Sequence, residues 1–217
     1  MPNFDFQGVY IAEYKKTESG YDYGKVIEMG DPMTCNLQMK YAEGRLYAKG
    51  GLREYKKIPV GGSLSVAVKY IHSEAQSVMF RKTEKTRSIN GKDAVSSALG
   101  TKNIPQYVGI GAYGADVVDG KDCFSAIFAH KTIFGAPGYA YSTKGETITF
   151  QTPTTTGEFL PSDNEDELMV EDIIVETAEE AINWINACFG KGEAAAAKAG
   201  ESTDTSGDGT MGSEVNN

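Results

Sequence analysis

Short runs of alternating apolar and polar residues dominate the chain from Val9 to Leu160. The two clearest runs cover residues 34–41 and 63–70. In an extended chain, one face of each run would carry its apolar side chains, which are Cys35, Leu37, Met39 and Tyr41 in the first and Leu64, Val66, Val68 and Tyr70 in the second. Because successive side chains of a strand point to opposite faces, this period predicts half-buried antiparallel strands. Gly61 and Gly62 are expected to form the turn before the second strand.

Weaker signals of the same kind predict further strands at residues 9–15, 24–29, 106–113, 122–133, 143–151 and 156–160. The run at 122–133 is apolar on both faces, with Phe124, Ala126 and Phe128 on one and Cys123, Ile127 and Ala129 on the other. Such a run is typical of a central strand covered on both sides, and it is also compatible with a subunit interface.

Two segments have the pattern of short helices. Residues 73–76 have capping-box spacing, and Ala75, Val78 and Met79 lie at the helical intervals i, i+3 and i+4. The box recurs at residues 177–180, and Gly190 is expected to end that second helix. Its docking side would carry Ile182, Trp184, Ile185 and Phe189. We therefore expect a mainly β fold, an antiparallel β-sandwich or barrel-like domain over residues 1–189 with one or two short flanking α-helices.

A long segment at residues 43–59 separates the two clearest strands and predicts a long hairpin or a mobile arm. Its candidate interaction residues are Arg45, Tyr47, Arg53, Tyr55, Lys56 and Lys57. Connections longer than about 12 residues are uncommon unless they bind something or are disordered. Residues 190–217 form an acidic tail rich in Gly, Ser and Ala, for which we expect disorder.

Composition and charge narrow the class of protein. The 217 residues are 40% apolar, enough for a core in one domain or two small ones. Residues 1–160 carry a net charge of +3 and residues 161–217 one of −12, so the chain lacks the basic footprint of a nucleic-acid-binding protein.

Three widely spaced cysteines indicate neither a disulfide framework nor a zinc site, and a reducing cytoplasm is expected. We find no signal peptide pattern and no apolar run of about 18 residues, so no membrane segment is expected.

Motifs for catalysis or cofactor binding are weak. Residues 109–114 match GxGxxG, but a turn is expected after them at residues 115–121, so close packing of a glycine-rich strand is favoured over nucleotide binding. Asp204, Ser206 and Asp208 imitate only half of a calcium loop. His72 and His130 are the only imidazoles and have no nucleophile or metal-ligand motif near them. We therefore expect no enzyme activity, no cofactor and no metal.

The order of these features resembles a known family. Gly8–Tyr14 is followed by Tyr23–Val26 and by the two alternating strands that flank the arm. The closing segment, Thr143–Thr154 with Thr156–Phe159, carries the letters TKGETITFQTPT and TGEF. Together these resemble the major tail tube proteins of long, non-contractile-tailed bacteriophages, the phi13-type family. The resemblance extends from Gly8 to Phe159 and more weakly through the Trp184 helix.

This resemblance implies a structural virion protein that forms hexameric rings stacked into a tail tube. DNA would pass through the lumen as cargo, and a negative or weakly charged lumen would let it slide. The implied partners are further copies of the chain, a tape measure protein, a tail terminator and distal tail or baseplate proteins. The implied location is the virion tail, after assembly in the host bacterial cytoplasm. We expect the 43–59 arm to reach the adjacent ring. The alternatives are a terminator or connector ring, a receptor- or glycan-binding tail module and, with least support, a nucleotide-dependent enzyme.

Overall fold

The structure, a computed structural model of the chain, describes residues 3–18, 20–138, 143 and 152–191. Its elements are β1 (Asn3–Thr17), β2 (Gly20–Tyr23), β3 (Ile27–Glu28), β4 (Pro32–Ala48), β5 (Gly51–Val68), α1 (Ser73–Phe80), β6 (Thr83–Ile89), β7 (Lys92–Ala98), β8 (Tyr107–Val118), β9 (Lys121–Phe134), β10 (Thr154–Leu160), β11 (Val170–Val175) and α2 (Ala178–Cys188). Residues 144–151 of one predicted strand, and residues 192–217 with the partial calcium motif, lie outside the described residues.

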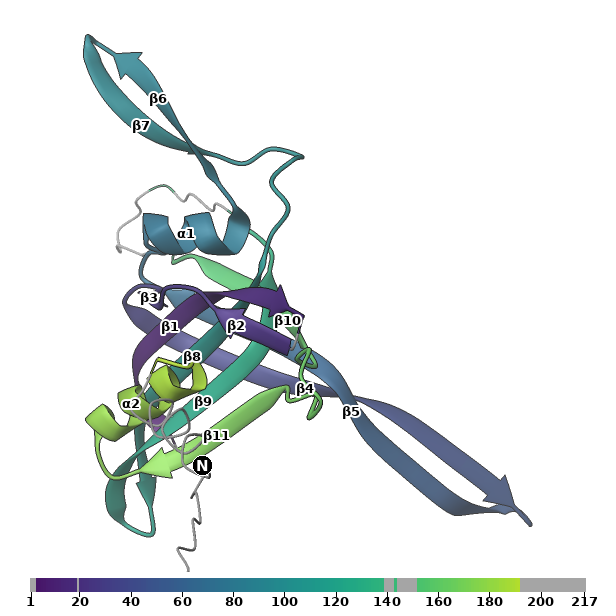
Figure 1. Cartoon of the computed structure of the whole chain (residues 1–217). Coiled ribbons are helices and arrows are strands. Elements are labelled where there is room, and N and C mark those ends of the chain that lie inside the picture. The colour runs from purple at the N-terminus through teal and green to yellow at the C-terminus, as the bar shows by residue number, and fades with distance from the viewer. Residues whose placement is uncertain (1–2, 19, 139–142, 144–151, 192–217) are drawn as a thin grey trace, which may run out of the picture.

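Most of the strands form one antiparallel sheet in the order β2-β1-β8-β9-β10-β5-β4 (Figure 1). β11 pairs with β9 alongside β10, and β3 pairs with β1. The sheet curves so that β1 also contacts β4. The predicted class, mainly β and antiparallel with two short helices and compatible with a sandwich or barrel-like fold, is therefore confirmed.

The two clearest predicted strands are confirmed and are longer than expected. They are β4 and β5, which pair along their whole length. The predicted turn at Gly61 and Gly62 is wrong, because both residues lie inside β5. Gly61 has φ +136° beside a register shift that leaves Val60 as an extra residue, which is a β-bulge. At Gly62 a Cβ atom would collide with the Phe159 ring, so close packing, and not a turn, requires this glycine.

Strand β9 is covered on both faces, as its sequence predicted. Ala129 belongs to a core between the curved sheet and α1, together with Val9, Leu64 and Met79. Phe128 points the other way into a second core under α2. β9 therefore separates the two apolar clusters of the domain.

Both predicted helices are present, but they are capped differently. The N-cap of α1 is His72 without a side-chain hydrogen bond, so the predicted box at Ser73 is wrong. The capping box of α2 is confirmed, since Thr177 and Glu180 each bond the other's backbone N–H. Gly190 ends α2 with φ +69°, and the N–H groups of Gly190 and Lys191 donate to the carbonyls of Ala187 and Asn186 in a Schellman motif.

Other boundaries differ from the prediction. Of residues 24–29 only Ile27–Glu28 is a strand. The expected turn at 115–121 is wrong at its start, because β8 continues to Val118 and the turn is only Asp119–Gly120. The sequence analysis did not predict β2, β6, β7 or β11.

Candidate assembly surface

The outer halves of β4 and β5 form an arm, here called the first arm, that leaves the body of the domain (Figure 1). Its strands pair from Tyr41 with Pro59 to Ala48 with Gly51. Lys49 and Gly50 make the two-residue turn at the tip, both with positive φ, which matches the twist of a hairpin. Of the two forms expected for residues 43–59, the structure therefore contains the long hairpin.

The first arm exposes large apolar side chains that a domain core would normally bury. Seven such side chains expose 45–62% of their surface. They are Tyr41, Leu46, Tyr47, Leu52, Tyr55, Ile58 and, at the bulge, Val60. So many large apolar side chains exposed together on a thin hairpin are typical of an interaction site.

The register divides this surface into two faces, because residues opposite one another in an antiparallel pair share a face. One face carries Tyr41, Glu43, Arg45, Tyr47, Leu52, Tyr55 and Lys57, and the other carries Ala42, Leu46, Glu54, Lys56 and Ile58. Four of the six candidate residues from the sequence therefore lie on the aromatic and charged face. Lys56 lies on the other face, and Arg53 lies at the register shift, where its Nε donates to the Ala48 carbonyl.

Charges on the aromatic face are largely paired within the arm. Glu43 lies 3.1 Å from an Arg45 nitrogen and 3.5 Å from Lys57 Nζ. The Arg45 guanidinium also lies over the Tyr55 ring, and Lys57 Nζ lies 4.3 Å from the Tyr41 ring centroid. Hydrogen bonds from Tyr55 and Arg45 lower the pKa of Glu43, which therefore stays ionised at neutral pH.

Strands β6 and β7 form a second arm, which the sequence analysis missed. They make a two-stranded sheet of their own, joined by Asn90 and Gly91 with positive φ. Every residue of β6 is exposed, and Ile89 and Val95 expose 58% and 66% of their surface. Asn-Gly is the strongest short hairpin signal, but the flanking residues lack an apolar face that would have marked them as strands.

The remaining candidate residues lie in the body and not on the arms. Ile185 and Phe189 of the α2 segment are fully buried, Trp184 lies at the edge of the same cluster and Ile182 is half-buried. On β9, Ala126 and Phe128 are buried in that cluster and Phe124 packs against it. The structure therefore joins the central-strand candidates and all the helix candidates except Ile182 in one core, and keeps the arm candidates separate.

The GxGxxG segment lies within β8 under α2. A Cβ atom at Gly109 would meet Tyr23 and Phe189, and one at Gly111 would meet Ile185 and Phe128. Close packing therefore accounts for these glycines, and no helix begins after them because β8 continues to Val118.

A polar network lies beside the second core. The Tyr23 hydroxyl donates to the His130 carbonyl over 2.8 Å. His130 Nε2 lies 2.7 Å from Glu171 Oε1 and Nδ1 lies 2.9 Å from the Tyr21 hydroxyl. A neutral imidazole that donates from Nε2 and accepts at Nδ1 satisfies both contacts. Burial lowers the pKa of His130 and raises that of Tyr23, so both are neutral at pH 7.

A cleft of about 400 Å³ opens between β1, β4, β8 and β9, lined by residues that include Asp5, Phe6, Cys35 and Tyr113. Burial raises the pKa of the Cys35 thiol to about 11, so Cys35 is not an activated nucleophile. The three cysteines are free thiols. Among the described residues, no group of three or more His, Cys, Asp and Glu is placed to hold a metal ion. Neither described helix has the length and apolar character needed to span a bilayer.

No protein-family model matches this chain, and no curated protein matches it.

Proposed function

We propose that the chain is a structural subunit that assembles with copies of itself, and that its assembly is a phage tail tube of stacked hexameric rings. The observation that carries the proposal is the pair of arms, whose side chains are exposed on both faces of each hairpin. An isolated two-stranded hairpin is only marginally stable in water. A contact with another molecule would bury the apolar side chains of the arms and supply the missing stabilisation.

The free edges of the sheet support the same proposal. Within the described residues β4 ends the sheet, so no described strand pairs with the backbone N–H and C=O groups on its edge away from β5. Strand addition between copies would satisfy them, and such head-to-tail contacts close into a ring when the rotation per subunit divides the circle. The first arm would then reach the next ring of the stack. The choice of a tail tube, and of six subunits per ring, rests on the resemblance of residues 8–159 to that family.

Negative-stain electron microscopy of the purified full chain over a concentration series tests this proposal, with light scattering on the same samples to give the mass. Tubes or stackable six-fold rings are the expected result. A discrete small oligomer that never stacks would instead favour a terminator or connector ring, and a monomer that binds glycans would favour a receptor-binding module. Assembled tubes should also bind duplex DNA weakly at physiological salt, because a lumen that neutralised phosphates would hold the genome.

A further inference from the structure

The second arm has one basic face and one face that carries its acidic residues. In the β6–β7 register, Lys85 lies opposite Ser96, Arg87 opposite Ala94 and Ile89 opposite Lys92, so Lys85, Arg87 and Lys92 share a face without a carboxylate. Glu84 and Asp93 lie on the other face. The opposing Ala94 and Ser96 are small, so the three cations dominate the surface of the basic face.

These three cations have no acidic partner, unlike Arg45 and Lys57 on the aromatic face of the first arm. No ion pair joins Lys85, Arg87 or Lys92 to another residue in the described part of the chain, whereas Arg45 and Lys57 share Glu43. Lys85 and Arg87 are two residues apart on one strand, which separates their Cα atoms by about 7 Å. The basic face is therefore a row of uncompensated positive charge on an unpartnered sheet face.

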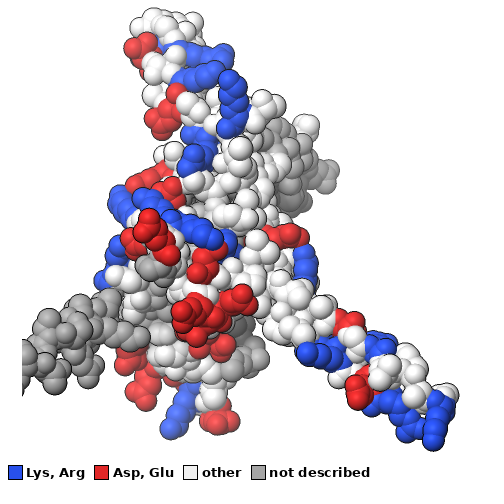
Figure 2. All heavy atoms as spheres, turned by 45° about the vertical axis from the view of Figure 1, so that its right-hand side comes forward, with Lys and Arg blue, Asp and Glu red and all other residues white. Residues whose placement is uncertain are grey.

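The opposite charge lies on another part of the same molecule. Residues 161–190 contain nine Asp and Glu and neither Lys nor Arg. Seven of these acidic residues are exposed, and one of them, Glu180, belongs to the capping box of α2. The other six are Glu165, Asp166, Glu167, Asp172, Glu176 and Glu179, and none of them is in an ion pair with another described residue. We call these six residues the acidic surface. Figure 2 shows Lys and Arg along both arms and a group of Asp and Glu on the body between them.

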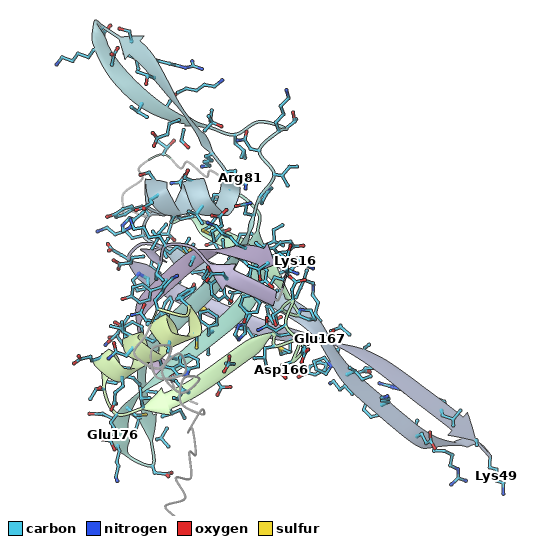
Figure 3. All side chains as sticks on the ribbon, viewed as in Figure 1. Lys16, Lys49, Arg81, Asp166, Glu167 and Glu176 are labelled. Carbon is cyan, nitrogen blue, oxygen red and sulfur yellow. The ribbon has the colours of Figure 1, made fainter. Side chains whose placement is uncertain are left out.

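The two charged surfaces lie apart on one copy. Figure 3 places Arg81 at the base of the second arm, and Asp166, Glu167 and Glu176 on the body away from it. The second arm therefore lies apart from the acidic surface of its own chain. A copy that offers a basic arm at one end and an acidic surface elsewhere is suited to a head-to-tail contact, which continues into a ring or a filament.

We propose that the basic face of the second arm, Lys85, Arg87 and Lys92, docks on the acidic surface of a second copy of this chain. This inference rests on the proposed self-assembly and assigns one of its contacts. Complementary charge sets the register of such a contact and speeds the encounter, and added salt weakens it. An anionic nucleic acid is the other partner that such a face could take, but this chain itself supplies the acidic surface that completes the contact.

Charge reversal in the full chain tests the contact by sedimentation velocity and light scattering. In Lys85→Glu/Arg87→Glu, we expect the concentration needed for half-maximal association to rise by about tenfold or more. The control Lys102→Glu/Lys121→Glu changes the net charge equally, at exposed positions outside both surfaces. It should shift the concentration needed for half-maximal association by less than about twofold. Because β6 makes no core contact, circular dichroism should show the same fold in both variants.

A mixing experiment decides whether the two charged surfaces contact each other. Asp166→Lys/Glu167→Lys should also associate poorly alone, and an equimolar mixture with Lys85→Glu/Arg87→Glu should regain association. A photo-crosslinking amino acid at Ser96, on the basic face, should label residues 161–180 of another copy.

Each contrary outcome has a distinct meaning. If the unmodified chain assembles and both reversed variants assemble equally well, or the cross-link maps elsewhere, the docking contact is wrong and the proposed function stands. If the unmodified chain never associates, both are wrong. Tight binding of a labelled DNA duplex by the unmodified chain, lost in Lys85→Glu/Arg87→Glu, would overturn the contact in favour of a nucleic-acid partner.

Discussion

Ile185 of α2 lies directly over Gly111 of β8, where a Cβ atom would collide with the isoleucine side chain. The helix can approach the sheet this closely only because β8 carries glycine beneath it. This contact joins α2 to β8, the neighbour of the central strand β9, and makes the second core sensitive to a single methyl group.

We therefore expect Gly111→Ala to lower the free energy of unfolding by about 1–3 kcal/mol, the usual cost of overpacking a core. Chemical denaturation followed by tryptophan fluorescence measures it, because Trp184 lies at the edge of this core. The matched control is Gly44→Ala on the first arm, where an added Cβ meets nothing within 4 Å. If both variants are equally stable, α2 does not pack on β8 as described.

His130 should make the fold less stable in mild acid. Burial lowers its pKa below the ordinary value of 6.5, while Glu171 acts in the opposite direction. Above pH 6.5 the imidazole is neutral in both states; as the pH falls below 6.5, the unfolded chain takes up a proton that the folded chain resists, so stability is lost. Denaturation at pH 7.5, 6.5 and 5.5 should show a shallower loss in His130→Gln than in the unmodified chain.

A second variant separates this effect from general acid sensitivity. Glu171→Gln removes the carboxylate that favours the imidazolium, so its stability should fall more steeply over the same pH range than that of the unmodified chain. The same dependence of stability on pH in all three proteins would show that protonation of His130 does not destabilise the fold.

Asp163 holds three partners from two strands, Tyr14 and Lys16 of β1 and Lys131 of β9. It accepts from Lys131 Nζ at 2.7 Å, from Lys16 Nζ at 2.8 Å and from the Tyr14 hydroxyl at 2.8 Å. Hydrogen bonds from Lys131, Lys16 and Tyr14 hold the pKa of Asp163 far below its ordinary range. We expect Asp163→Asn to destabilise the fold by about 1–3 kcal/mol, since it leaves two cations without their carboxylate.

Asp166→Asn is the control for this substitution, because Asp166 is exposed and forms no ion pair with the other described residues. Thermal unfolding should show a change of less than about 0.5 kcal/mol for Asp166→Asn. Similar midpoints for the two variants would contradict a structural role for Asp163.

Shortening the first arm should abolish assembly without unfolding the subunit. Replacing residues 44–56 by Asn-Gly keeps the Glu43–Lys57 pair and closes it with a favoured two-residue turn. The removed residues are exposed, so the midpoint of thermal unfolding should stay within a few degrees of that of the unmodified chain. Tubes of normal length in electron micrographs of this variant would show that the arm is not needed for stacking.

Alternation made the core strands predictable because one face of each is buried. Leu64, Val66 and Val68 are fully buried and lie on the face that their spacing predicted. Tyr70 follows the same spacing but lies beyond the end of β5 and is 51% exposed, since periodicity gives no strand boundary.

The missed elements lack that pattern for physical reasons. β6 has no buried face at all, so only Asn90-Gly91 could have indicated its hairpin. β11 pairs with β9 beside β10, but Glu171 and Asp172 interrupt its apolar pattern and hid Ile173 and Ile174 as strand residues. Gly61 and Gly62 predicted a turn where β5 in fact continues. The Phe159 ring that requires Gly62 comes from a strand about 100 residues later, so the sequence near Gly62 gave no sign of it. The exposed residues of the first arm were predicted from the sequence, whereas the assignment of charges to the two faces of each arm needed the register.

The continuity of β5 from the arm into the core also has a mechanical consequence. Its outer half is the arm, and its inner half pairs with β10 along residues 62–67. A pull on the arm tip along the strand direction would load the hydrogen bonds on both sides of β5 in shear, so that many must break together and not one at a time. The first arm is therefore anchored in the core of the domain so that it resists a pull along the strand direction.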